Sequence, residues 1–374
     1  GQWAELNAPQ DLARLILGTK AETLERLKPL VQLSQIGEQI SFNLDQWKTD
    51  RESLLSSIKQ KFRDQILIVR SSAGSEDGWK SSKAGAHLSL LNISSRDQEK
   101  LSDAITQVGG SYGDDSPEHQ VLIQRMLTDV LISGVVFTRL LNTGAPYYTI
   151  NYDETTQRTN SVTNGTGQNL KTIVLHRNSN RLPKGINPLL SELLPSLREL
   201  ESLVKYDSLD IEFAISNDQK VHILQIRPIT VDHTIYHFSD EEVKNSIEIA
   251  KSSFLARQTA DRTSILGDHA YFGVMPDWNP AEIIGTKPQR LAFSLYRYLI
   301  TDEIWATQRA EWGYRDVRPQ PLLVNFSGHP YVDIRASFNS FIPADIPDTL
   351  AQRLVNHYLT RLRENPHFHD KVEF

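Results

Sequence analysis

The first seventy residues switch between helical and extended hydrophobic patterns. Residues 11–31 have the spacing of an amphipathic helix that begins after Pro9, and Gly18-Thr19-Lys20 is expected to break this helix in two. Polar and apolar positions then alternate, helical spacing returns, and a short apolar run has the composition of a fully buried strand. The pattern therefore predicts a strand, a helix and a buried strand, in that order, over residues 38–44, 45–62 and 65–70.

A long polar segment follows the buried strand. Residues 71–86 consist mostly of Ser, Gly, Lys, Glu and Asp. This length exceeds that of an ordinary loop in a compact domain, so we expect the segment to be functional or disordered. A strand over residues 87–91 and a polar helix from about Arg96 come next.

The middle of the chain is expected to consist of strands around one helix. Pro195 lies inside the predicted helix, residues 188–206, where it would produce a kink. The segment Ser216–Lys220 has the composition of a hairpin turn between the last two strands. The predicted strands cover residues 119–124, 131–138, 147–152, 172–176, 209–215 and 221–227.

From about Thr230 the pattern becomes mainly helical. Helical spacing is present in three segments, residues 239–257, 290–312 and 346–364. We therefore predict an α+β protein in which mixed regions precede a mainly helical one. The predicted divisions are residues 1–118, 119–232 and 233–374.

The composition is that of a chain that folds. Over 374 residues, 39% are hydrophobic and 8% aromatic, which excludes disorder as the main state. The net charge is −6, from 40 Lys and Arg against 46 Asp and Glu, and no stretch gathers the basic residues. Nucleic acid is therefore not an expected partner. The chain has no Cys, which excludes disulfides and Cys-ligated zinc and is typical of a reducing compartment.

The apolar runs are too short for a membrane protein. The longest, Ile66–Val69 and Val130–Phe137, fall far below the roughly 18 residues of a spanning helix. The N-terminus lacks the basic and apolar regions of a signal peptide, and Gly1 in place of Met indicates a processed or engineered start. We expect a cytoplasmic protein that does not contact a membrane.

Charged residues gather on one face of the last predicted hairpin. With a two-residue turn at Asp218-Gln219, Glu212 lies opposite Gln225 and Asp210 lies opposite Arg227. Carboxylate and amide oxygens suit Mg²⁺, which is usually shared with substrate phosphates. The alternative is a solvated sheet face with a surface salt bridge.

A second cationic group ends the buried strand. Arg70 offers a planar fork for phosphate oxygens, and Ser71 and Ser72 add hydroxyl and amide donors. Glycines in the polar segment, Gly74, Gly78 and Gly85, would let backbone amides approach an anion. The alternative is a flexible surface loop, and Lys20, a third cation, would by itself be a surface lysine.

Four motifs in this order resemble the phosphoenolpyruvate synthase and pyruvate phosphate dikinase family. The first is Val69-Arg70-Ser71-Ser72-Ala73, followed by Ser75-Glu76-Asp77 and Ala84-Gly85. The second is Gln124-Arg125-Met126, with Ser133-Gly134-Val135-Val136-Phe137-Thr138 after it. The closing pair is Leu209-Asp210-Ile211-Glu212-Phe213 and Leu224-Gln225-Ile226-Arg227-Pro228.

The resemblance implies an ATP-grasp nucleotide-binding domain of two subdomains that hold ATP and Mg²⁺ between them. It implies that Arg70 and Arg227 contact the terminal phosphates as catalytic residues, and that Glu212 and Gln225 are the magnesium ligands. Lys20 matches a phosphate-contacting lysine, although Gly18-Thr19-Lys20 departs from the family's Gly-Gly-Lys. The implied nucleotide site comprises Lys20, Arg70, Ser71, Ser72, Gln124, Met126, Asp210, Glu212, Gln225 and Arg227, with Gln124 to Met126 near adenine.

The same resemblance implies a dikinase-type reaction. ATP phosphorylates a histidine on a mobile domain, which passes the phosphoryl group to a small-molecule acceptor while AMP and phosphate are released. None of the 11 His has the family's Thr-Ser-His context, so His87, His222 and His329 are interpreted as structural or surface residues. We therefore expect a fragment whose partner is the phosphohistidine domain of the same parent chain.

The acceptor is predicted from a further resemblance. Residues 18–24, 277–285 and 331–340 are similar to the L-glutamine kinases of bacterial capsule phosphoramidate biosynthesis, which implies the glutamine side-chain amide as acceptor. Aromatic and polar residues in the last two segments are expected to lie in loops of a small-molecule site. Arg315, Arg318 and Arg335 are candidate acceptor ligands; the alternative is helix-end and surface arginines.

Three other functions stay open. One is a phosphoenolpyruvate synthase, which acts on pyruvate, and another is a family member that phosphorylates a larger acceptor such as an antibiotic. The last is a nucleotide-binding module without catalysis.

Overall fold

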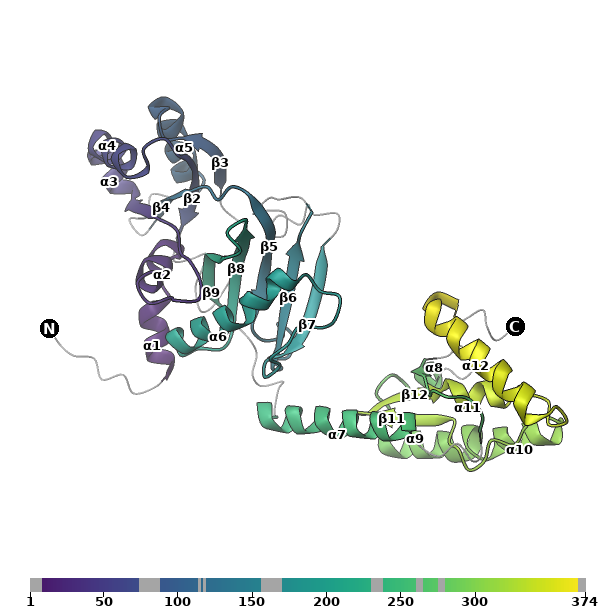
Figure 1. Cartoon of the computed structure of the whole chain (residues 1–374). Helices are drawn as coiled ribbons and strands as arrows, with labels where there is room; N and C mark the ends of the chain where they lie inside the picture. Colours follow the sequence, from purple (N-terminus) through teal and green to yellow (C-terminus); the bar gives the residue numbers. More distant parts are fainter. Residues whose placement is uncertain are drawn as a thin grey trace. The chain divides into compact units, whose positions relative to one another are not determined.

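The computed structural model describes most of the chain. The described residues are 9–73, 88–113, 116, 119–155, 170–229, 238–259, 265–274 and 280–368. They divide into two units, unit 1 over residues 1–240 and unit 2 over residues 241–374. Figure 1 shows the elements of each unit.

Unit 1 contains a four-stranded antiparallel sheet, named here the first sheet. Its strands run in the order β1-β4-β2-β3. Helices α3, α4 and α5 cover one face, where Ile58, Phe62, Leu101 and Ile105 pack against the strands in one hydrophobic core. The elements are β1 (Gln39–Asn43), α3 (Leu44–Thr49), α4 (Arg51–Phe62), β2 (Ile66–Ser72), β3 (Ser89–Ser94), α5 (Gln98–Gly110) and β4 (Gln120–Arg125).

A second antiparallel sheet of five strands completes unit 1, in the order β7-β6-β5-β8-β9. Leu24 of α2 and Leu197 of α6 belong to the core that covers one face of this second sheet. The helices are α1 (Pro9–Ile16), α2 (Lys20–Leu27), η1 (Pro188–Glu192) and α6 (Leu193–Val204). The strands are β5 (Val130–Phe137), β6 (Tyr147–Asp153), β7 (Lys171–His176), β8 (Leu209–Ser216) and β9 (Val221–Pro228).

The predicted boundaries differ from the observed ones. We predicted a subdomain boundary near residue 118, but β4 pairs with both β1 and β2 and so belongs to the first sheet. The chain passes to the second sheet between the end of β4 at Arg125 and the start of β5 at Val130. Unit 1 likewise ends at Asp240 rather than near residue 232. Hydrophobic pattern identifies a strand but not the sheet that it joins, because pairing is a long-range property.

Unit 2 is mainly helical, and it also contains a small sheet, β10-β12-β11, that the sequence analysis missed. These strands are two to five residues long, too short for a clear alternation. Trp305, Val332 and Val355 belong to its core. The elements are α7 (Asp240–Thr259), which starts at the last residue of unit 1, β10 (Phe272–Gly273), α8 (Pro280–Ile283), α9 (Arg290–Tyr296), a π-helical turn η3 (Arg297–Thr301), α10 (Ile304–Glu311), β11 (Leu323–Phe326), β12 (His329–Asp333), α11 (Ile334–Asn339), α12 (Asp348–Glu364) and η4 (Pro366–Phe368).

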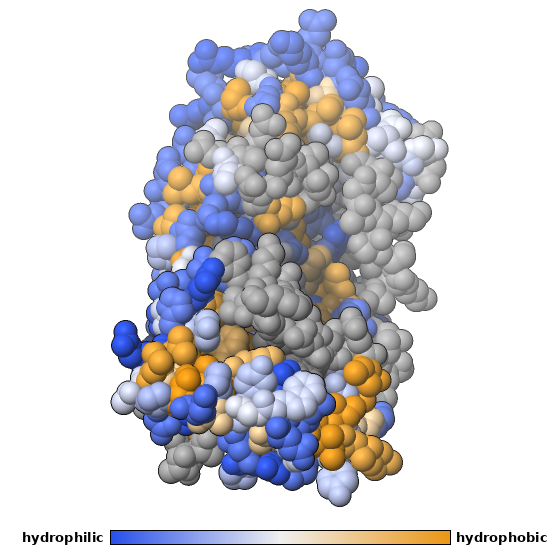
Figure 2. All heavy atoms as spheres, turned by 90° about the vertical axis from the view of Figure 1, so that its right-hand side faces the viewer, coloured by the Kyte–Doolittle hydropathy of each residue, from blue (hydrophilic) through white to orange (hydrophobic). Residues whose placement is uncertain are grey.

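The α+β fold class is therefore confirmed. Two antiparallel sheets with helices on one face of each precede a mainly helical unit. On the face shown in Figure 2, hydrophilic residues surround several patches of exposed apolar residues. Within the described part of the chain, no helix is both long enough and apolar enough to cross a bilayer.

A buried ionic network lies in unit 1. Arg177 contacts Glu201 at 3.2 Å and Asp207 at 3.2 Å, and the Tyr148 hydroxyl donates to Glu201 at 2.8 Å. Burial raises the pKa of the Glu201 carboxyl to about 7, and the charge of Arg177 opposes this rise. Glu201 therefore carries a desolvation cost when it ionises.

We expect this cost to make stability depend on pH. A carboxyl whose pKa is raised on folding contributes stability below its unfolded pKa, near 4.5, and loses it as pH rises through about 7. Glu201→Gln keeps an oxygen acceptor for Tyr148 but cannot ionise, so its stability should fall less than that of the wild type between pH 5 and pH 8. Urea unfolding at both pH values measures the difference, and Glu25→Gln, at an exposed position, is the control. If the free energy of unfolding depended on pH in the same way for all three proteins, the raised pKa of Glu201 would be contradicted.

Candidate functional site

The β8–β9 hairpin has the predicted pairing at its functional end. Glu212 lies opposite Gln225, and Asp210 lies opposite Arg227, as predicted. The turn differs, because Ile215 pairs with Val221 and Gln219 adopts a positive φ of 59°. A two-residue turn would have paired Ile215 with His222.

The pairing near the turn is therefore shifted by one residue, and a β-bulge further along the hairpin compensates for this shift. Phe213 pairs with Ile223 and Glu212 with Gln225, so Leu224 is the extra residue on β9. Strict alternation from Gln225 would turn Leu224 to the core, but Ile223 takes that place at 2% exposure and Leu224 is only half-buried. The bulge thereby keeps Gln225 and Arg227 on the same face as the two carboxylates.

One ion pair on this face lies within the hairpin. The Arg227 guanidinium donates from Nε to Asp210 Oδ2 at 2.7 Å, and its terminal nitrogen lies 2.5 Å from the same oxygen. Both side chains are largely buried, as is Gln225 at 3% exposure. The Asp210–Arg227 ion pair is therefore too buried to be the solvated surface salt bridge that was the alternative interpretation of this face.

Arg70 joins the first sheet to this face. Its guanidinium lies 3.3 Å from Glu212 Oε2 and donates to the Leu224 carbonyl at 3.4 Å. The carbonyl belongs to the bulge residue. The Arg70 and Glu212 side chains are only 13% and 15% exposed, and they are separated by 142 positions in the sequence.

The buried Nε of Arg70 makes no hydrogen bond among the described residues. An unsatisfied buried donor costs about 1–3 kcal/mol, and more when the group is charged. A bound anion would supply the acceptor. Among the described residues, the Nε donor of Arg70 is therefore available to an anion at the position where phosphate was predicted.

Lys20 is the first residue of α2 and is 7% exposed. Thr19 caps this helix: its hydroxyl accepts from the Glu22 amide at 3.3 Å, and Glu22 accepts from the Thr19 amide. The departure from Gly-Gly-Lys thus has a local structural role, because Thr19 forms a capping box that Gly cannot form.

Polar contacts missed in the sequence analysis attach α2 to the first sheet. Ser72 Oγ accepts from the Ala21 amide at 3.0 Å, and Gln39 donates to the Ala21 carbonyl at 2.7 Å. The Thr19 hydroxyl donates to Gln120 at 3.0 Å. Lys20 directly precedes Ala21, the residue whose amide donates to Ser72, so Ser72 positions α2 in this structure. No local pattern marks Gln39 or Gln120, because their partners lie far away in the sequence.

The remaining candidate nucleotide-binding residues, Ser71, Gln124 and Met126, lie on β2, on β4 and just after β4. Ser71 is buried beside Arg70 on β2. Gln124 is buried on β4 and donates to Gln39 at 3.4 Å. Met126 follows β4 and lines a cavity whose described lining includes none of the other candidates. The acidic and glycine positions expected beyond Ala73, including Glu76, and His87 lie outside the described residues.

The donor set agrees with the magnesium prediction in kind. Glu212 supplies a carboxylate and Gln225, opposite it, an amide oxygen, and Mg²⁺ commonly binds one or two such groups together with substrate phosphates. Across the described ranges, no group of three or more His, Asp or Glu could hold a metal by itself. Water or substrate oxygens would complete the shell of a metal bound by Glu212 and Gln225.

The candidate acceptor arginines of unit 2 are all engaged. Arg315 contacts Asp348 at 2.6 Å, and Arg318 contacts Asp316 at 2.6 Å and Glu303 at 3.0 Å. Arg335 is fully buried and donates to the Gly267 carbonyl at 3.4 Å.

We predicted that the segment 331–340 lies in a loop, and this prediction is wrong. It forms the end of β12 and helix α11, and Arg335, Ser337, Asn339 and Ser340 are fully buried. Asn339 accepts from the Leu266 amide and donates to the Leu266 carbonyl, both at 2.8 Å. The polar residues that resembled a ligand site instead bind backbone within the core. Residues 277–279 of the other expected loop lie outside the described residues.

Comparison with known proteins gives distant structural similarities. No family model and no curated protein matches the chain. Among solved structures, the D-alanine-D-alanine ligase of Helicobacter pylori has a TM-score of 0.35 and 16% identity over 60% of this chain and 58% of its own. The Coxiella burnetii D-alanine-D-alanine ligase has a TM-score of 0.33 and 11% identity, over 60% and 56%.

A third similar structure is a RiPP-associated ATP-grasp ligase of Chryseobacterium gregarium in complex with ADP, leader and core peptide. Its TM-score is 0.34 and its identity 11%, over 67% of this chain and 63% of its own. The match thus spans less than two thirds of each of these three proteins. These TM-scores lie below 0.5, so the similarities do not assign a function to the chain.

Proposed function

We propose that unit 1 is an ATP-grasp domain that binds Mg·ATP between its two sheets, as the ATP-binding part of a dikinase-type phosphotransferase. The observation that supports this most directly is Arg70. It is buried, it contacts Glu212 of the other sheet at 3.3 Å, and its Nε has no acceptor among the described residues. A polyphosphate would supply that acceptor.

The proposed roles follow from charge and geometry. Arg70 and Arg227 bind terminal phosphate oxygens, because a guanidinium fork matches them in a bidentate manner. Without nucleotide, each arginine is neutralised by a carboxylate, Arg70 by Glu212 and Arg227 by Asp210. These internal pairs limit the cost of burying four charges before the ligand arrives.

Binding of Mg·ATP would exchange these partners. Glu212 and Gln225 would turn their oxygens to the metal, and Arg70 would turn from Glu212 to phosphate. Mg²⁺, when bound, supplies positive charge that offsets the charge developing on the transferred phosphoryl group. Lys20, placed by the Ala21–Ser72 contact, adds a cation on the side of β2.

This chain's contribution to the reaction is positioning and charge neutralisation. Phosphoryl transfer depends mainly on these two effects. In the proposed reaction ATP and water yield AMP and phosphate, while one phosphoryl group passes through a histidine of another domain to the acceptor. We propose the side-chain amide of L-glutamine as acceptor, on the sequence resemblance alone.

Magnesium dependence tests the nucleotide site. We expect ATP to bind at least tenfold more weakly when EDTA replaces Mg²⁺, because the triphosphate then faces Glu212 and Asp210 without a metal between them. Isothermal titration calorimetry of the chain measures both affinities, and AMP, which lacks terminal phosphates, is the control ligand. Equal ATP affinities with and without Mg²⁺ would contradict the roles of Glu212 and Gln225.

The acceptor is tested by phosphorus NMR of the full-length protein with Mg·ATP. A phosphoramidate signal with AMP, formed only when L-glutamine is present, supports the proposed acceptor. Formation of phosphoenolpyruvate from pyruvate would instead assign the synthase reaction. If no AMP forms with either acceptor, neither reaction is supported.

A further inference from the structure

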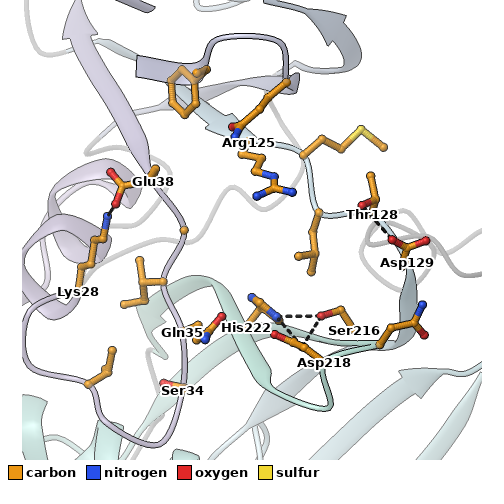
Figure 3. Close-up of a pocket in the computed structure, with 18 of the residues that line it drawn as sticks. Lys28, Ser34, Gln35, Glu38, Arg125, Thr128, Asp129, Ser216, Asp218 and His222 are labelled. Atoms are coloured by element: carbon orange, nitrogen blue, oxygen red, sulfur yellow. Dashed lines mark hydrogen bonds and ion pairs between the residues drawn. The ribbon is translucent and has the colours of Figure 1, made fainter. Parts of the chain in front are cut away.

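We propose that unit 1 has a second ligand site, in which Arg125 binds a small organic anion. The site is a cavity of about 650 Å³ at the passage between the two sheets. Figure 3 shows Arg125 pointing into it, with Lys28 and Glu38 on one side and Thr128 and Asp129 on the other. Among the residues described, its lining includes none of Lys20, Arg70, Glu212, Gln225 and Arg227, and Met126 is the one residue that it shares with the implied nucleotide site.

Both sheets contribute to the cavity. Lys61 and Phe62 at the end of α4, with Gln65, come from the layer of the first sheet, and Ser216 and His222 come from the β8–β9 hairpin. The volume falls within the range of about 300–1,000 Å³ that is usual for small-molecule sites. Apolar side chains supply part of the wall: Val31, Ile36, Phe62, Met126 and Leu127.

Arg125 is the group that selects an anion. It is the last residue of β4, its side chain is exposed, and that side chain makes no hydrogen bond or ion pair within the described part of the chain. By contrast, Arg70, Arg177 and Arg227 of unit 1, described above, all contact carboxylates, and so does Arg139, which contacts Asp207 at 2.6 Å. A guanidinium directed into a cavity, with five donors and no protein acceptor, suits a phosphate or carboxylate.

The neighbouring wall is also cationic. Glu38 lies between Lys28 and Lys61, contacting both, so these three side chains carry a net charge of +1. Their hydrogen bonds lower the pKa of Glu38, which keeps this arrangement charged. Arg125 and the Lys28–Glu38–Lys61 group thus carry a net charge of +2 on their side of the cavity, which Asp129 and Asp218 on the other walls offset.

The two acidic residues on the other walls have partners of their own. Asp218 accepts from the Ser216 hydroxyl at 2.6 Å and from the Lys220 amide at 3.1 Å, which lowers its pKa to about 2, and it contacts His222. Asp129 accepts from Thr128 at 3.3 Å. The Asp218 carboxylate is therefore already solvated by protein donors.

The ligand class that fits this cavity is a metabolite-sized molecule with one phosphate or carboxylate and a partly apolar body.

Calorimetric titration of the chain with phenyl phosphate and with benzoate, at fixed ionic strength, tests this site. We expect saturable binding of at least one probe, and the stronger probe identifies the anionic group preferred. Arg125→Gln should weaken that binding at least tenfold, and Arg125→Lys should retain part of it. Arg96→Gln is the matched control, since Arg96 is an exposed arginine paired with Asp64. Thermal unfolding by circular dichroism verifies that each variant is folded.

Two results would overturn the inference. One is the absence of saturable binding of both probes to the wild type, and the other is unchanged binding by a folded Arg125→Gln variant. If Arg70→Ala removes the binding and Arg125→Gln does not, the anion occupies the proposed ATP site instead. That outcome would reject this second site while leaving the proposed function intact.

Discussion

Replacing Arg70 by Ala should lower the affinity for Mg·ATP by about 10- to 100-fold. Hydrogen bonds to charged groups contribute roughly 1.5–3 kcal/mol, and each 1.4 kcal/mol is a tenfold change in affinity. Arg70 is the only described residue of the first sheet that forms an ion pair with the β8–β9 hairpin. Its loss removes the proposed phosphate ligand and leaves Glu212 without that cation. Calorimetry with Mg·ATP measures the change.

The controls separate a binding defect from a folding defect. AMP affinity should change little in Arg70→Ala, because the proposed contact is with the terminal phosphates. Arg96→Ala removes an arginine whose pair with Asp64 is 70% and 64% exposed, so Mg·ATP affinity should not change. An equal loss for ATP and AMP would move Arg70 away from the terminal phosphates, and undiminished ATP binding would reject its role.

Replacing Gly134 by Ala should destabilise unit 1 by about 3 kcal/mol, the upper end of the range for overpacked cores. Gly134 lies on β5 between Tyr152 of β6 and Phe213 of β8. An added Cβ would lie 2.5 Å from the Asn151 carbonyl oxygen and 2.7 Å from the Phe213 ring. The oxygen belongs to a paired backbone, so it cannot move aside without disturbing the sheet. Urea unfolding followed by circular dichroism measures the loss.

A glycine in an open position is the matched control. Gly110 is the last residue of α5, and nothing lies within 4 Å of a Cβ built there. Gly110→Ala should therefore be neutral or stabilising by up to about 1 kcal/mol, because Ala loses less backbone freedom on folding. Similar unfolding curves for Gly134→Ala and the wild type would show that β5 has more room than the structure indicates.

The chain from β1 to β9 was predicted well because its signals are local. The short apolar runs of β4 and β5, the alternation over β6 and β8, and the break of the first helix at Gly18 are properties of neighbouring residues. The short strands of unit 2 were missed for the same reason. Four residues in β11 and five in β12 do not establish a period.

Electrostatic pairing of the site could be predicted only in part. The spacing of Asp210, Glu212, Gln225 and Arg227 places them together on any hairpin with this register. The prediction of the register was correct although the turn was not, because the bulge at Leu224 compensates for the turn. That bulge also frees the Leu224 carbonyl, which accepts from Arg70.

The sequence by itself determined which side chains share a strand face, because side chains alternate along a strand with a period of two residues. It therefore brought together the carboxylates, the amide and Arg227 of the hairpin. Only the tertiary structure decided that Arg70, 142 positions away, reaches Glu212, and that Arg335 packs into a core instead of facing a ligand. Contacts between distant segments depend on how whole layers pack, and no local pattern records that packing.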